Sequence, residues 1–158
     1  MEHVNWIKGA AASAVAVLTA LWGWFGWLVV LWVALMVVDY ATGSFAAMRG
    51  GNWSSREARD GIWHKAGSIV IVIVAGAADL LIGAILGHLP GITLPWNYTV
   101  LVCPIVVVWY SLTEMGSIIE NAVALGAPCP KWLASAIDKL QDAVDAAGDK
   151  ITEDKPNG

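Results

Sequence analysis

The feature that most constrains this chain is the run at residues 9–48, in which Asp39 is the only ionised side chain. As one straight helix this run would be about 60 Å long, twice the ~30 Å hydrocarbon thickness of a bilayer. Two glycines in the tryptophan-rich stretch 22–27 favour a break there, and tryptophan rings suit the membrane–water interface. We therefore predict spans at about 6–21 and 28–48, with one long kinked helix as the alternative.

Two further apolar runs, at about 61–87 and 98–125, predict two more spans. The chain is 58% hydrophobic and 14% charged, whereas a soluble domain keeps about a quarter of its residues charged. We therefore expect an all-α membrane protein with four transmembrane helices, or three if the first run does not insert. Residues 1–130 would form this transmembrane bundle, and Pro104 is expected to kink its last span.

Residues 131–158 have a different pattern, which predicts a cytoplasmic amphipathic helix and a charged tail. Apolar side chains recur at three- and four-residue spacing, at Leu133, Ile137, Leu140 and Val144. The other side of the predicted helix carries Asp138, Lys139, Asp142 and Asp145. Because this polar face is mainly acidic, its attraction to anionic lipid is weak, and a packing surface for a partner is an equal alternative. The tail after Gly148 is expected to be disordered.

Basic residues predict the orientation, because cytoplasmic loops of membrane proteins collect Lys and Arg. The connection at 49–60 carries three arginines, whereas the connections at 22–27 and 88–97 carry no Lys or Arg. Four spans would therefore put both termini in the cytoplasm, and three spans would put the N-terminus outside. Gly50, Gly51 and Asn52 mark a turn, and Ser54 and Ser55 followed by Glu57 mark a helix start. The residues assigned to this cytoplasmic loop and its edge, where Lys65 would be an interfacial anchor, are Arg49, Ser55, Arg56, Arg59, Gly61 and Lys65.

Acidic residues inside the apolar runs need an explanation, because a charge at the bilayer centre costs several kcal/mol. Asp39 and Asp79 are expected well inside the membrane, and Glu114 in the middle of the last span. Each lies in a stripe of small or polar residues at helical spacing, and Gly83 with Gly87 has the spacing that allows close helix packing. Either the stripes form the seam of a packed bundle or they line a wet path in an assembled state. The candidates for these roles are Asp39, Thr42, Gly43, Asp79, Gly83, Glu114, Ser117, Glu120 and Asn121.

The sequence offers no nucleophile constellation, phosphate loop or Cys/His metal spacing, so we expect no enzyme, no cofactor and no metal site. The net charge of −4 argues against a nucleic-acid partner. Cys103 and Cys129 are predicted to be free thiols. A helix of about 26 residues would hold them roughly 39 Å apart, far beyond the ~7 Å that a disulfide allows.

Short motifs follow one another along most of the chain. Asp39-Tyr-x-Thr-Gly43 is followed by Ala47, Ser54-Ser55, Gly61, Lys65 and Asp79, then by Gly116-Ser-Ile-Ile-Glu120-Asn121 and Gly126-x-Pro128-x-Pro130. In this order and spacing, over about residues 22–133, they resemble the phage holin family of the toxin-secretion and phage-lysis type. The tryptophan-rich turn and the acidic C-terminal tail depart from the family's pattern.

The resemblance implies a small protein of the bacterial inner membrane, with membrane lipid and further copies of itself as partners. Such proteins accumulate and then assemble into lesions that release an endolysin or a secreted toxin or enzyme, and an antiholin would be a regulatory partner. The positions it marks for packing and assembly are Asp39, Thr42, Gly43, Ser55, Gly61, Lys65, Asp79, Glu120 and Asn121. The residues alone leave two other functions open: a small ion or solute channel or transporter, and a membrane scaffold whose C-terminal helix recruits a partner.

Overall fold

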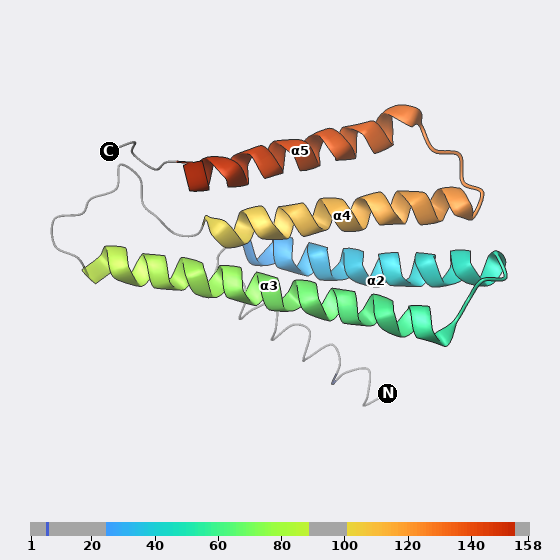
Figure 1. Cartoon of the computed structure of the whole chain (residues 1–158), viewed down its shortest axis with the longest axis horizontal. Helices are drawn as coiled ribbons and strands as arrows, with labels where there is room; N and C mark the ends of the chain where they lie inside the picture. The colour runs from blue at the N-terminus through green and yellow to red at the C-terminus, as the bar shows by residue number, and fades with distance from the viewer. Residues whose placement is uncertain (1–5, 7–24, 89–100, 154–158) are drawn as a thin grey trace.

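The computed structural model describes residue 6, residues 25–88 and residues 101–153 of the chain. The described part is all-helical, as predicted, and no strand occurs in it. Its long helices lie side by side along a common axis, and successive helices run in opposite directions (Figure 1). They are α2 (Gly26–Arg49), α3 (Ser55–His88), α4 (Val102–Ala124) and α5 (Lys131–Glu153).

Three of the described helices, α2, α3 and α4, are long and apolar enough to cross a membrane. The predicted span at 6–21 lies outside the described residues apart from Trp6. Large aliphatic side chains on the spanning helices are exposed on the bundle surface, among them Val37, Val74 and Leu81. Lipid is the natural solvent for such a surface, so the chain is a multi-pass membrane protein.

A small core holds α2, α3 and α4 together in the half of the bundle where α2 and α4 begin. Trp32 of α2 is 2% exposed, and its ring lies 5.9 Å from that of Tyr110 on α4. Cys103 is buried here as a free thiol, and Cys129 is also free, as predicted. The core consists of Phe25, Trp32, Met36, Val72, Ala75, Cys103 and Val107.

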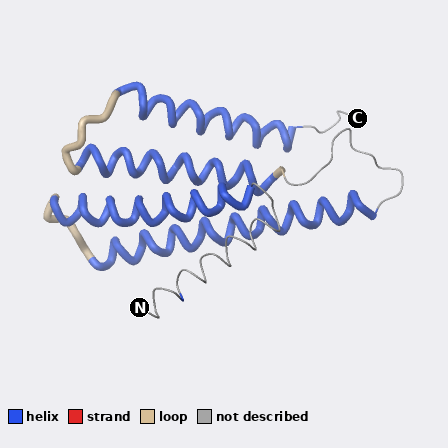
Figure 2. The backbone as a smooth tube through the Cα atoms, turned by 180° about the vertical axis from the view of Figure 1, so that it is seen from behind, coloured by secondary structure: helices blue, strands red, loops and turns tan. Residues whose placement is uncertain are grey.

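The two short described connections, between α2 and α3 and between α4 and α5, lie at the same end of the bundle (Figure 2). At the first, Gly51 has a φ of +71°, and the next N–H, that of Asn52, donates to the Ala47 carbonyl at 3.0 Å. Gly126, with a φ of +96°, ends α4 in the same way. This left-handed cap favours glycine because it has no Cβ, and it confirms the predicted turn at residues 50–52.

The predicted helix start before the third span is confirmed, but the helix continues from there without a break. The Ser54 hydroxyl accepts the Glu57 N–H at 3.2 Å, and α3 begins at Ser55. The assignment of Ser55, Arg56 and Arg59 to a loop was therefore wrong, since all three belong to α3, whereas Gly61 lies in the predicted third span as expected. Its 34 residues make α3 about 51 Å long, so it extends beyond a ~30 Å hydrocarbon layer.

Two other expectations concern single residues. Pro104 is the third residue of α4, where a backbone N–H has no partner within the helix, so the proline removes no hydrogen bond from α4. The C-terminal helix does not stop at Gly148, because α5 continues to Glu153. A single glycine weakens a helix by only about 1 kcal/mol, which neighbouring residues offset.

Asp79 caps a helix other than its own. Its side chain is on α3 and 1% exposed, yet its carboxylate accepts the backbone N–H groups of Leu101, Val102 and Cys103 at 3.0, 2.9 and 2.8 Å. The first backbone N–H groups of a helix have no acceptor within the helix. The N-cap residue of α4 is Leu101, whose apolar side chain cannot accept a hydrogen bond from them. Asp79 therefore lies where α4 begins and joins α3 to that helix.

We expect Asp79→Ala to lower the free energy of unfolding by at least ~2 kcal/mol, because buried N–H groups would lose their acceptor. Asp79→Asn keeps one carbonyl oxygen and should lose less. Both are measured by denaturant unfolding in detergent micelles, with Asp60→Ala, an exposed position of α3, as the control. An Asp79→Ala effect no larger than that of the control would contradict the capping role.

Candidate functional site

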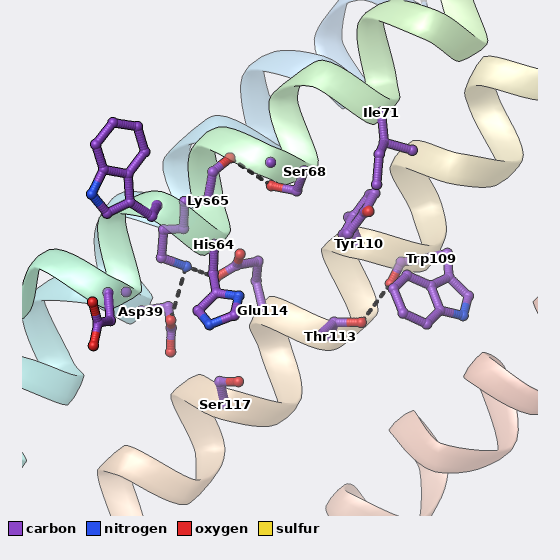
Figure 3. A pocket seen from close by; sticks show the side chains of 14 residues that line it. Asp39, His64, Lys65, Ser68, Ile71, Trp109, Tyr110, Thr113, Glu114 and Ser117 are labelled. Carbon is purple, nitrogen blue, oxygen red and sulfur yellow. Dashed lines mark hydrogen bonds and ion pairs between the residues drawn. The ribbon is translucent and has the colours of Figure 1, made fainter. Parts of the chain in front are cut away.

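One lysine of α3 lies between a carboxylate of α2 and a carboxylate of α4. Lys65 Nζ is 2.9 Å from Asp39 Oδ2 and 2.5 Å from Glu114 Oε2 (Figure 3). All three side chains are largely buried, with 10–18% of each exposed. Lys65 was predicted to anchor the chain at the membrane interface, but it points into the bundle and joins three helices.

Asn121 of α4 extends this arrangement along α2. Its Nδ2 group donates to Asp39 Oδ1 at 3.0 Å and to Thr42 Oγ1 at 3.3 Å. Gly43 makes this approach possible, because a Cβ at that position would lie 3.3 Å from Asn121 Nδ2. We call Asp39, Thr42, Lys65, Glu114 and Asn121 the polar cluster. It brings together the stripes that the sequence indicated on two separate spans.

The polar cluster is the main link between α2 and α3, which otherwise contact each other little, since α3 packs mainly on α4. With both acids ionised its charge is −1, and the Lys65 ammonium can donate to both at once. Paired charges inside a protein are tolerated in lipid far better than isolated ones. Removing one partner of a buried ion pair is strongly destabilising, because the remaining charge has no compensation.

The polar cluster also divides the bundle into an apolar half and a more polar half. Residues 26–38 of α2 and 102–113 of α4 precede it, and neither segment carries an Asp, Glu, Lys or Arg. These segments are about 20 Å and 18 Å long. If one face of a ~30 Å hydrocarbon layer lies where α2 and α4 begin, the other face lies roughly 10 Å beyond the polar cluster. The cluster therefore lies at membrane depth, toward the end that carries the short connections.

An open groove of about 810 Å³ lies over the polar cluster, between α3 and α4. Asp39, Lys65 and Glu114 line it together with Ser117, another of the predicted residues (Figure 3). Within the described ranges, no group of three or more His, Cys, Asp or Glu residues is placed to hold a metal ion. The groove thus exposes ionisable side chains at membrane depth, in a bundle whose surface is largely aliphatic and aromatic.

The remaining predicted residues lie apart from the cluster. Glu120 is exposed although its neighbour Asn121 is in the cluster, and a Cβ on Gly83 would meet no atom within 4 Å. Arg49, the last residue of α2, donates from Nη1 to the Leu125 carbonyl at 2.6 Å and so joins the ends of α2 and α4. Ser55, Arg56 and Arg59 are exposed, and Gly61 is half-buried.

Sequence reasoning missed the inward position of Lys65, although a signal for it was present. The stripe that contains Asp79 extends back at helical spacing through Ala75 and Val72 to Ser68, and Lys65 lies one helical step before Ser68 on the same face. The two residues are also in contact, since the Ser68 hydroxyl donates to the Lys65 carbonyl at 2.8 Å. Extending the stripe by three residues would have included the lysine.

We expect Lys65→Met to lower the free energy of unfolding by about 3–5 kcal/mol, because Asp39 and Glu114 would face each other without a cation. The triple variant Lys65→Met, Asp39→Asn, Glu114→Gln should recover most of this loss. Denaturant unfolding in micelles measures both. A triple variant as unstable as the single one would mean that charge compensation is not what Lys65 provides.

We expect Gly43→Val to separate α2 from α4 and to cost about 1–3 kcal/mol, because the new side chain overlaps Asn121. Gly83→Val is the matched control, since its position is open and the change in helix propensity is the same. The readout is thermal unfolding of the micellar protein. Equal destabilisation by the two substitutions would rule out close approach at Gly43.

Comparison with known proteins gives consistent results. The sequence model of the bacteriophage holin family matches residues 16–142. An uncharacterised protein of Halalkalibacterium halodurans is 34% identical over 135 residues, which cover 85% of this chain and 93% of that protein. An uncharacterised 14.9 kDa protein in the nagH 3′ region of Clostridium perfringens is 26% identical over 143 residues, covering 90% and 98% of the two chains. No solved structure matches.

The family match covers α2, α3 and α4 completely, together with the first half of α5. It therefore includes all three described helices that can span a membrane and every residue of the polar cluster. The motifs that suggested a resemblance lie inside the same range. The chain belongs to the bacteriophage holin family.

Proposed function

We propose that this protein acts as a holin. It oligomerises in the bacterial inner membrane, with both termini in the cytoplasm, and forms lesions. These release an endolysin, or a secreted toxin or enzyme, to the cell wall. The observation that carries the proposal is the family match over residues 16–142 on a chain with three described helices able to span a membrane. The protein turns over no substrate in this account, and the cargo needs no specific binding site.

The polar cluster provides a physical route from a silent protomer to an open lesion. In the protomer, Asp39 and Glu114 share Lys65, so these charges compensate one another inside the bundle. When protomers crowd, the groove over the cluster turns toward a shared aqueous lumen, where water solvates the same groups. The exposed aliphatic faces of the helices stay in lipid throughout.

The packing of the bundle supports such a rearrangement. The apolar core is small, and most side chains of the three spanning helices are not buried in the protomer. Exchanging helix contacts between copies therefore disrupts little apolar packing. A change of membrane potential would bias the exchange, because moving one charge across the membrane is worth about 2.3 kcal/mol per 100 mV.

We expect induced expression of the intact protein in bacteria to release a folded cytoplasmic reporter enzyme after a delay. Enzyme activity in the medium is followed over time, and membrane fractionation confirms that each variant inserts. Asp39→Asn should change the delay without preventing insertion, because Lys65 keeps Glu114 as its partner. Arg59→Gln, which also removes one charge but lies on the exposed surface of α3 outside the groove, is the control and should keep the normal delay.

Two results would contradict different parts of this account. Selective ion current without release of the reporter at any expression level would favour a small channel over a holin. Normal release with an unchanged delay in Asp39→Asn would separate the polar cluster from timing while leaving the holin function intact.

A further inference from the structure

The C-terminal helix α5 is amphipathic, and α4 covers only part of its apolar face. That face carries Leu133, Ile137, Leu140, Val144 and Ile151, which recur at helical spacing. Ile137 is 5% exposed, whereas Leu140 and Ile151 keep 53% and 46% of their surface exposed. Two hollows, of about 310 and 410 Å³, flank the contact between α4 and residues 140–149 of α5. The apolar face of α5 is therefore larger than the contact that α4 offers it.

The docked position of α5 conflicts with the topology proposed for the inserted chain. The helix begins at the end of the bundle that carries the short connections, and its last turns lie beside the start of α4 (Figure 1). Both helices have 23 residues, so each is about 35 Å long and extends through a ~30 Å hydrocarbon layer. In the proposed holin the C-terminus lies in the cytoplasm, on the side of the connections. A docked α5 would end on the opposite side.

The charges of α5 also argue against a position at membrane depth. It is not among the described helices that are apolar enough to cross a membrane. Asp138, Asp142 and Asp145 follow one another at four- and three-residue steps and form an acidic stripe opposite the apolar face. A charged side chain at the bilayer centre costs several kcal/mol. A helix with one apolar face and one strongly charged face is instead typical of the membrane–water interface.

The hydrogen bond described between α4 and α5 can break without leaving a hydroxyl of α4 unpaired. Gln141 Nε2 donates to Thr113 Oγ1 at 3.2 Å, and the Thr113 hydroxyl itself donates to the Trp109 carbonyl at 3.1 Å. Thr113 therefore keeps a partner within α4 when α5 departs. Next to it, the surface that α4 presents to α5 is aliphatic and includes Val108 and Leu112. Lipid can replace α5 on such a surface.

The connection at 126–130 allows α5 to turn away from α4. Gly126 ends α4 with a φ of +96°, so α4 stops there wherever α5 lies. Two prolines follow, and α5 begins at Lys131. Its first turn carries Trp132, which is 69% exposed, and a lysine beside a tryptophan suits the membrane–water interface. A rotation about this connection would lay α5 along the membrane surface at the end where α4 finishes.

We propose that in the inserted protein α5 lies flat on the cytoplasmic surface of the membrane and binds lipid by its apolar face. The inference rests on the proposed holin function, because that function places the C-terminus in the cytoplasm. Lipid then covers Leu140 and Ile151, and the acidic stripe faces the cytoplasm. Because the polar face is mainly acidic, the apolar face supplies the attraction to the membrane. The position on α4 is the alternative site for the same face and is an outcome of both tests below.

The first test compares the accessibility of two positions of α5. Ser135→Cys and Ala146→Cys are made in a Cys129→Ser background, in which the remaining native thiol, Cys103, is buried. The two positions are exposed and eleven residues apart, so they share one face and differ by about 16 Å along the helix. In inverted membrane vesicles prepared before release begins, a charged maleimide should label both at rates within about twofold of each other.

Labelling rates in detergent serve as the reference, because both positions are also exposed in the docked helix. A docked α5 would hold Ala146→Cys at membrane depth and slow its labelling at least roughly tenfold relative to Ser135→Cys. That result would overturn the inference, and it leaves the holin function standing if the intact protein releases the reporter enzyme. Failure to release the reporter under any condition would instead reject the proposed function, while the labelling still reports where α5 lies.

The second test measures depth within the bilayer. A fluorophore at Leu140→Cys is compared with one at Met115→Cys on an exposed face of α4, in the same background. Docked α5 would place the two at nearly the same depth, since Gln141 lies beside Thr113. Lipids with a nitroxide near the headgroup should quench the Leu140→Cys fluorophore more than lipids with a nitroxide deep in the chain, and the order should reverse at Met115→Cys. Stronger quenching by the deep nitroxide at both positions would contradict a surface position for α5.

Discussion

The bridge from Lys65 to Asp39 and Glu114 is the contact on which the rest of the bundle depends. Long apolar helices have little reason to prefer one register over another in lipid, because every face is equally oily. A lysine that must meet two carboxylates fixes the relative height of three helices at once. Asn121 and Gly43 then set how closely α2 and α4 approach. The small apolar core adds packing but could not specify this alignment alone.

The same bridge relates stability to function. Asp39, Lys65 and Glu114 compensate one another in the protomer. On assembly they can pass from this pairing to water without any of them facing lipid, provided that neighbouring protomers enclose the water. The surface of the groove over the polar cluster runs along α3 and α4. That surface carries the ionisable side chains of Asp39, Lys65 and Glu114, and in our proposal assembly turns it toward the lumen.

Sequence patterns predicted the helices better than the partners of individual residues. Hydropathy predicted the three spanning helices that the structure describes, α2, α3 and α4. Helical spacing placed Asp39 and Glu114 on polar stripes. Periodicity shows which residues share one face of a helix, but it does not show which other helix that face contacts. Lys65 was therefore grouped with the loop, and Asp79 could not be recognised as the cap of another helix. The docking of α5 on α4 was likewise invisible, because an amphipathic pattern fits a membrane surface and a packed helix equally well.

The central claim is that the groove face of α4 becomes wet when copies assemble. The most direct measurement compares two variants of α4, each with one introduced cysteine at nearly the same depth, Ser117→Cys in the groove and Met115→Cys on an exposed face. Both are made in a Cys129→Ser background, in which the native thiol that remains, Cys103, is buried. Their reaction rates with a charged thiol reagent are followed in membranes before and after release begins. The account predicts that the rate at Ser117→Cys rises relative to that at Met115→Cys. An unchanged ratio while the reporter enzyme is released would contradict it.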